Sequence, residues 1–187
     1  RLLGFPVEFF SGPDLPRISE HSASFRSMSK MSAALRDSAL NAGSLAFVLN
    51  TWIESRFKLP TADLPDLSDL SPEDAAATLR RMWGIGQAPV SNMIHLLESK
   101  GIRVYSLAIE AREVDAFSVW HEGTPFVFLN TFKSAEHSRF DAGHELGHLV
   151  RDRRLLDVGD RDHVDVLRRH RRFGCCLGRL AQERQLR

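Results

Sequence analysis

The segment that most constrains this chain is residues 139–150, RFDAGHELGHLV, in which His144, Glu145 and His148 form an H-E-x-x-H motif. On an α-helix, residues four positions apart lie one turn apart on the same face, so two imidazoles at this spacing can bind one Zn²⁺. The glutamate beside the first histidine points toward the same site and can take a proton from water at the metal. We therefore expect two zinc ligands, His144 and His148, and one catalytic general base, Glu145.

The motif alone fixes three positions and also occurs on ordinary surface helices, so its surroundings matter. Leu146, Leu149 and Val150 supply the apolar cover of a half-buried helix. Gly143 and Gly147 each cost about 1 kcal/mol relative to alanine inside a helix. Glycines at these positions indicate close approach of a strand or a substrate. The sequence predicts a metal-binding helix that is capped at Ser134 and ends near residue 150.

Composition sets the wider limits. With 187 residues, 43% of them hydrophobic, the chain can bury a sizeable core in one domain with appendages. Its net charge of +1 gives no general affinity for nucleic acid or membranes. Cys175 and Cys176 are adjacent and form no disulfide framework, and no apolar run reaches 18 residues. We expect a cytoplasmic protein without membrane association, and the start at Arg1 suggests a fragment of a longer chain.

Four regions follow from composition and periodicity. Residues 1–30 read as the tail of an upstream domain plus a linker, and residues 31–88 as a helical connector. Residues 89–150 form the metal-binding domain, and residues 151–187 an atypical Arg-rich tail. The connector contains a long helix over residues 32–57 whose broad apolar stripe predicts a core face or, alternatively, a homodimer interface.

Two further helices follow in the chain, one opened by Ser71 and one stopped by Gly101, with a polar loop over residues 59–70 before them. Three strands are then expected over residues 102–107, 116–120 and 126–129, with a hairpin turn at His121-Glu122-Gly123 between the last two.

The predicted fold class is α+β, with a small three-stranded, mostly antiparallel sheet that leads into the HExxH helix. We expect residues 126–129 to be an edge strand, on which a substrate peptide could add as a further strand.

Three stretches, LLESKGIRVYSL, DAFSVWHEGTPFVFLN and SRFDAGHELGHLV, resemble the ImmA/IrrE family of metallo-endopeptidases. The resemblance covers roughly residues 91–150 and implies a zincin-like domain. Characterised members cleave repressor proteins of stress regulons or mobile elements, and many carry an N-terminal helix-turn-helix domain of the XRE type. Residues 1–12 are similar to the end of such a domain, so DNA binding is expected only through a missing N-terminal domain. Gly143 stands where the family usually has alanine.

The resemblance also implies a third, acidic zinc ligand from a later helix, and the expected acid is missing from its place before Phe173. Asp165 or His163 could lie one or two turns earlier on the same helix. The remaining candidates in the tail are Asp160, Asp162 and His170. Without a third protein ligand a two-histidine site binds zinc weakly.

The tail after residue 150 has 11 Arg and no Lys among its 37 residues. One hypothesis is a shifted reading frame that replaced the ligand helix. The other is a genuine basic tail whose residues 167–172, LRRHRR, contact nucleic acid or an acidic partner.

Three further histidines need an interpretation. His95 and His121 are expected to be structural or solvated. His137 lies two helical turns before His144 and could contact the metal ligands without binding the metal itself.

The motif and the resemblance together imply two functions. The first is a zinc-dependent endopeptidase, for which the resemblance implies narrow specificity and a repressor-type DNA-binding protein as substrate. The alternative is a non-catalytic sensor module of an XRE-type transcriptional regulator.

Overall fold

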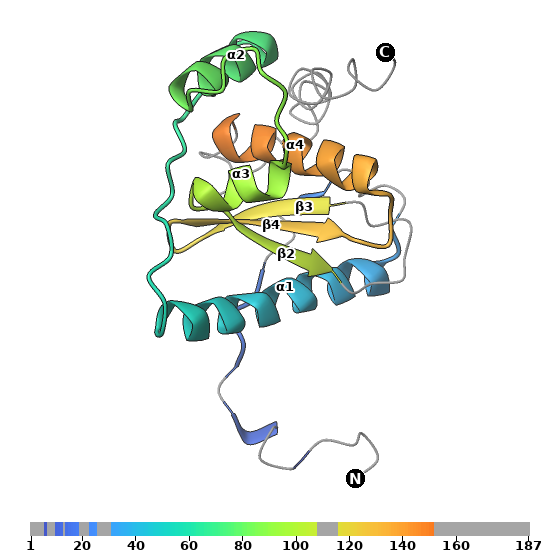
Figure 1. Ribbon diagram of the computed structural model, residues 1–187. Coiled ribbons are helices and arrows are strands. Elements are labelled where there is room, and N and C mark those ends of the chain that lie inside the picture. Colours follow the sequence, from blue (N-terminus) through green and yellow to red (C-terminus); the bar gives the residue numbers. More distant parts are fainter. Residues whose placement is uncertain are drawn as a thin grey trace.

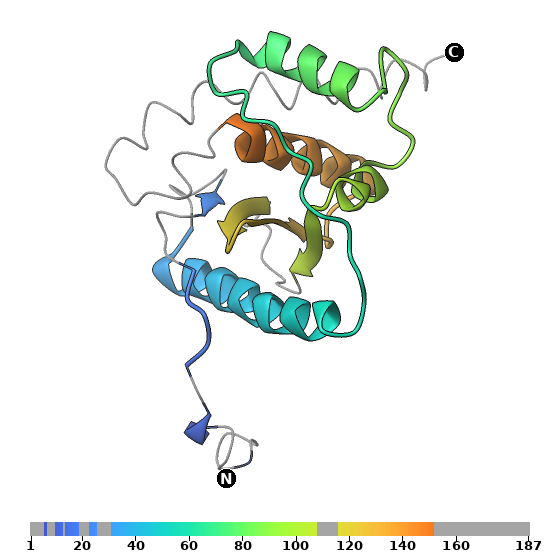
Figure 2. The ribbon, with the colours of Figure 1, turned by 90° about the vertical axis from the view of Figure 1, so that its left-hand side faces the viewer.

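A sheet with helices on both faces forms the centre of the molecule (Figure 1). The computed structural model describes residues 6, 10–12, 14–18, 23–25, 31–107 and 116–151. The elements in chain order are β1 (Ser24–Phe25), α1 (Ala33–Glu54), α2 (Pro72–Met82), α3 (Met93–Ser99), β2 (Arg103–Leu107), β3 (Ala116–His121), β4 (Thr124–Asn130) and α4 (Ala135–Arg151). Helix α1 covers one face of the sheet, α3 and α4 cover the other, and α2 lies outside α4 (Figure 2). The α+β fold class is thus confirmed.

The sheet has the strand order β1-β3-β4-β2 and is mixed. Strands β3 and β4 form the expected antiparallel hairpin, which turns at Glu122 (φ 49°) and Gly123 (φ 75°). Strand β1 pairs antiparallel with β3, whereas β2 pairs parallel with β4. The fourth strand, β1, comes from a segment that we expected to be a linker.

The predicted edge strand is wrong. Strand β4 lies between β3 and β2 and therefore offers no open edge to a substrate peptide. The physical reason is that β2 pairs with the second side of β4, while β3 pairs with the first. Six of the seven residues of β4 are also buried, including positions that face opposite sides, because helices cover both faces of the sheet. An apolar run of this kind does not by itself distinguish a central strand from an edge strand.

Each face of the sheet carries its own core. The alternating residues Phe126 and Phe128 of β4 pack against α1, and Val127 and Leu129 pack against α3 and α4. Strand β3 follows the same rule. Its residues Phe117 and Val119 join the α1 core, and Ala116 and Trp120 join the α4 core.

Helix α1 begins as expected, because the side chain of Ser32 accepts a hydrogen bond from the backbone N–H of Leu35. Only one side of the helix is buried. The opposite side exposes four large apolar side chains, so the broad stripe does not lie wholly in the core. These are Leu45, Val48, Leu49 and Trp52.

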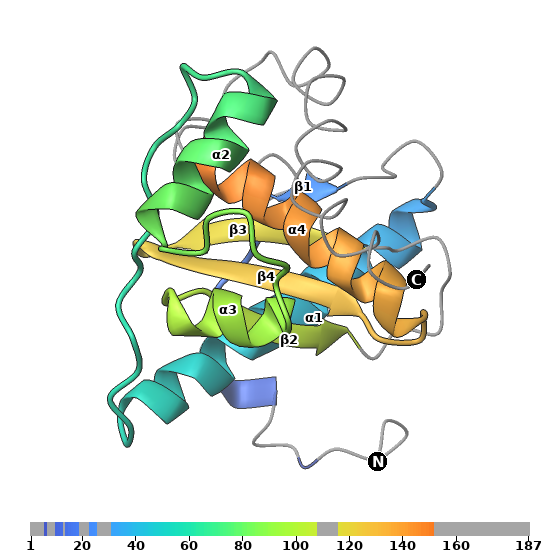
Figure 3. The ribbon, with the colours of Figure 1, turned by 45° about the horizontal axis from the view of Figure 1, so that its top comes forward.

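The segment before α2, expected to be a polar loop, buries Leu64 and Leu67 in the α4 core. The backbone N–H of Leu67 donates to the carbonyl of Val150, and Arg151 Nη2 donates to the carbonyl of Leu70. These bonds attach the C-terminal end of α4 to the segment that leads into α2. In Figure 3 this end of α4 lies next to α2. Among the residues that the structure describes, no helix combines the length and apolar character needed to cross a membrane.

Candidate metal centre

Helix α4 carries the motif and is buried along its C-terminal half. Its first turn is closed by Ser134, whose Oγ accepts a hydrogen bond from the backbone N–H of His137. From residue 141 to residue 150 every position is buried against the sheet and the neighbouring helices. The exposed fractions of His144, Glu145 and His148 are 4%, 0% and 1%. The predicted helix is confirmed.

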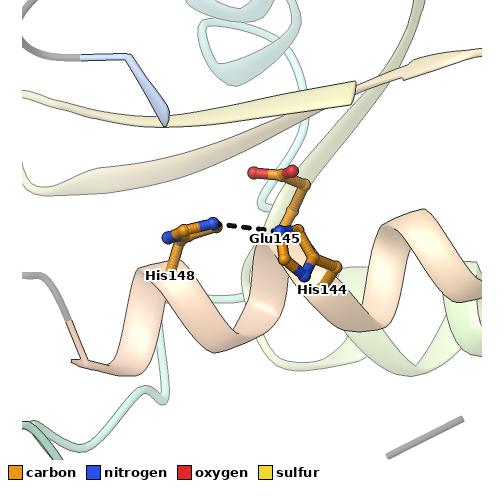
Figure 4. Close-up of side chains that lie close together, drawn as sticks. All are labelled: His144, Glu145 and His148. Atoms are coloured by element: carbon orange, nitrogen blue, oxygen red, sulfur yellow. Dashed lines mark hydrogen bonds between the residues drawn. The ribbon is translucent and has the colours of Figure 1, made fainter. Parts of the chain in front are cut away.

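The two histidines converge on one point (Figure 4). Their Nε2 atoms lie 3.2 Å apart, and the rings are nearly perpendicular, at 84°. Two nitrogen ligands at 2.0–2.1 Å from a tetrahedral zinc must lie about 3.3–3.4 Å apart. The observed separation therefore fits an ion shared by both rings. Ligand atoms of His144, Glu145 and His148 all lie within 4.8 Å of one another, which makes this group a candidate metal site.

Glu145 points from α4 toward the sheet, where it meets a residue that sequence reasoning missed. Ser118 Oγ on β3 donates a hydrogen bond of 2.8 Å to Glu145 Oε2, and neither side chain has any exposed surface. One signal in the sequence could have revealed Ser118. It interrupts the apolar residues at a strand position where the alternation calls for a core side chain.

A second buried acid lies one helical turn before Glu145. Asp141 is 1% exposed, and its Oδ2 lies 3.7 Å from Nε2 of the half-exposed His137. His137 thus contacts an acid on its own helix. The ring of Phe140 lies nearly parallel to that of His144, with centroids 6.5 Å apart.

The other histidines lie elsewhere. His95 is exposed on α3. His121 stacks on Phe47 of α1, with ring centroids 3.9 Å apart and planes within 3°, on the far face of the sheet. The candidates for a third ligand, including Asp165 and His163, lie outside the described residues.

The α+β fold and the H-E-x-x-H group on a buried helix are those expected of a zincin-like domain of the metallopeptidase type. Residues 97–172 match the sequence profile of the IrrE N-terminal-like domain. This part of the chain is therefore an ImmA/IrrE family domain, which confirms the resemblance drawn from residues 91–150. The match runs from the end of α3 through α4 and 22 residues past Val150, into the Arg-rich tail. No curated protein and no solved structure matches the chain.

Proposed function

We propose that this domain is a zinc-dependent endopeptidase in which His144 and His148 hold the metal and Glu145 is the general base. The observation that carries the proposal is the 3.2 Å separation of the two Nε2 atoms beside a buried carboxylate on the same helix face. Imidazole nitrogens on one face of a helix suit zinc, and the family to which the domain belongs is of the metallopeptidase type.

A zinc ion held here supplies a Lewis acid that polarises a peptide carbonyl and lowers the pKa of water. The protein's own residues do the remaining work. The two imidazoles keep their Nε2 lone pairs directed at one point. The Glu145 carboxylate accepts a proton from the attacking water and later delivers it to the leaving amine of the cleaved peptide. A third protein ligand has to come from outside the described residues, where Asp165 and His163 stay candidates.

The proposed substrate is a repressor-type DNA-binding protein, cleaved with narrow specificity. The burial of the site supports narrow specificity, because side chains that are at most 4% exposed cannot meet a peptide unless neighbouring segments move. A substrate whose binding energy displaces those segments is cleaved in preference to a peptide that cannot displace them. The same burial also favours a second candidate function, a non-catalytic regulatory module in which the closed site senses a partner or ligand.

We further propose that DNA binding requires an additional N-terminal domain, and that the protein works in the cytoplasm. A homodimer would form through the exposed apolar side of α1, namely Leu45, Val48, Leu49 and Trp52. Sedimentation of the purified protein beside a Leu49→Glu variant tests the dimer. A dimer that dissociates in the variant supports it, and a monomeric parent protein excludes it.

Zinc content and cleavage, measured together, test the main proposal. We expect about one tightly held zinc per chain, lost in His148→Ala and retained in His95→Ala, whose exposed histidine is the matched control. Glu145→Gln should keep the zinc and abolish cleavage of a repressor encoded beside the gene. A parent protein that binds no zinc contradicts the proposal. Zinc binding with cleavage unaffected by Glu145→Gln contradicts the role of the base, and zinc binding without any cleavage favours the sensor.

A further inference from the structure

The hydrogen bond between Ser118 and Glu145 joins the central part of the sheet to the candidate base. Ser118 Oγ lies 2.8 Å from Glu145 Oε2, and both side chains are 0% exposed. The neighbours of Ser118 on the same face of β3, Ala116 and Trp120, are part of the apolar core. A serine hydroxyl in such surroundings is costly unless it finds a partner, and here the partner is the carboxylate.

Ser118 is held more firmly than a loop residue would be. In β3 it pairs antiparallel with Val127 of β4 on one side and with Ser24 of β1 on the other. Its backbone is thus fixed by strands on both sides, and the hydrogen bond to Glu145 holds its hydroxyl toward α4. A functional group supported by a rigid element can hold a second group to within the tolerance that catalysis requires.

The chemistry assigns different tasks to the two carboxylate oxygens of Glu145. A glutamate side chain has three rotatable bonds, and a proton transfer needs one oxygen in a defined place. A hydrogen bond donated to Oε2 fixes the plane of the carboxylate. The other oxygen, Oε1, is then the one directed to the proton that moves.

We propose that Ser118 is a positioning residue for Glu145, which orients the carboxylate toward the ligand that occupies the zinc. This inference rests on the proposed peptidase function and deepens it. Ser118 touches neither metal nor substrate and acts only through the hydrogen bond to Oε2.

The test compares wild type, Ser118→Ala, Glu145→Gln and the double variant, with zinc and acetohydroxamate as probes. A hydroxamic acid binds zinc through its two oxygens and shares its proton with a neighbouring carboxylate, so its affinity reports the placement of Glu145. We expect Ser118→Ala to bind zinc as wild type does and acetohydroxamate about 10-fold more weakly, the loss typical of a hydrogen bond to a charged group. Glu145→Gln should weaken acetohydroxamate binding at least as much. Adding Ser118→Ala to Glu145→Gln should not weaken it further. Where a cleaved peptide is in hand, kcat should fall with KM unchanged.

A second measurement examines the contact without metal. In the metal-free protein, a double-mutant cycle of thermal unfolding between Ser118→Ala and Glu145→Gln should show a coupling. Zero coupling overturns the inference. Should Ser118→Ala fail to fold, Ser118→Cys keeps the volume and offers only a weak donor, and the same loss of hydroxamate affinity is expected.

The outcomes separate the two proposals. Normal zinc binding with unchanged hydroxamate affinity in the Ser118 variants overturns the role of Ser118 and leaves the peptidase intact. A wild-type protein that binds no zinc overturns the peptidase and, with it, the positioning role.

Discussion

His144 Nε2 and His148 Nε2 lie 3.2 Å apart in the interior, on successive turns of α4. Two neutral imidazoles at this distance share a single hydrogen bond, with one ring as donor and the other as acceptor. A metal ion uses the lone pairs of both nitrogens instead. The pair is therefore arranged so that an ion, once bound, becomes part of the folded core.

Zinc should stabilise the fold. A ligand that binds only the folded state at 100 times its Kd contributes about 2.7 kcal/mol, which shifts the Tm of a domain of this size by roughly 5–10 °C. We expect calorimetry to show this shift between zinc-loaded and EDTA-treated protein. In His148→Ala the two curves should coincide, whereas His95→Ala should behave as wild type. A parent Tm that is insensitive to zinc would contradict the prediction.

Replacing Gly101 should destabilise the fold more than replacing Gly84. Both glycines adopt positive φ, at 79° and 70°. A Cβ at position 101 would lie 2.2 Å from the carbonyl oxygen of Thr61, whereas a Cβ at position 84 would meet nothing within 4 Å. Left-handed backbone costs a non-glycine residue about 1 kcal/mol or more, and the clash adds to it only at position 101. In urea unfolding, Gly84→Ala should lower the free energy of unfolding by about 1 kcal/mol, and Gly101→Ala should lower it by at least twice as much. Equal losses would contradict the account.

Arg80 should stabilise the fold far more than its neighbour Arg81. Arg80 is 5% exposed, and its guanidinium donates to the carbonyls of Gly86 (2.7 Å) and Ala88, which closes the loop after α2. Hydrogen bonds from charged groups contribute about 1.5–3 kcal/mol each, so Arg80→Ala should cost about 3 kcal/mol. Arg81 is exposed, and within the described part of the chain its guanidinium donates a hydrogen bond only to Thr78 Oγ1, at 3.4 Å. Arg81→Ala, at the adjacent helix position, should change the free energy of unfolding by less than about 0.5 kcal/mol.

The ion pair between Glu54 and Arg103 should make a small, pH-dependent contribution. Arg103 Nη2 lies 2.9 Å from Glu54 Oε1 and joins the end of α1 to β2. The hydrogen bond from Arg103 holds the pKa of Glu54 below its ordinary value. A lowered folded-state pKa means that the stabilisation is complete above the unfolded pKa of about 4.3 and is lost as the pH falls through the folded pKa.

Because Glu54 is 40% exposed, the pair is worth only about 0.5 kcal/mol at pH 7. Urea unfolding of wild type and Glu54→Gln should differ by this amount at neutral pH and converge at acid pH. A difference that persists at pH 2 would show that packing, not charge, is responsible.

The helices and strands, and the H-E-x-x-H motif, were predictable because their signals are local. Caps at Ser32, Ser71 and Ser134, the stop at Gly101 and the turn at Gly123 all act over a few residues. The H-E-x-x-H spacing likewise fixes its own geometry, since any α-helix brings positions 144 and 148 to one face.

Strand order was not predictable in the same way. The apolar run of β4 is compatible with an edge or a centre, and only the parallel pairing of β2 on its second side made it central. Strand β1 depends on contacts with a strand more than 90 residues later in the chain, which no local pattern records.

The sequence by itself therefore determined the motif, its helix and the α+β class, because these follow from the 3.6-residue and 2-residue periods of the backbone. Tertiary structure alone decided which strand lies beside the site and that Ser118 donates to Glu145, 27 positions later. The physical reason is that a hydrogen bond between two elements depends on how they pack, and packing is a property of the whole core rather than of any one segment.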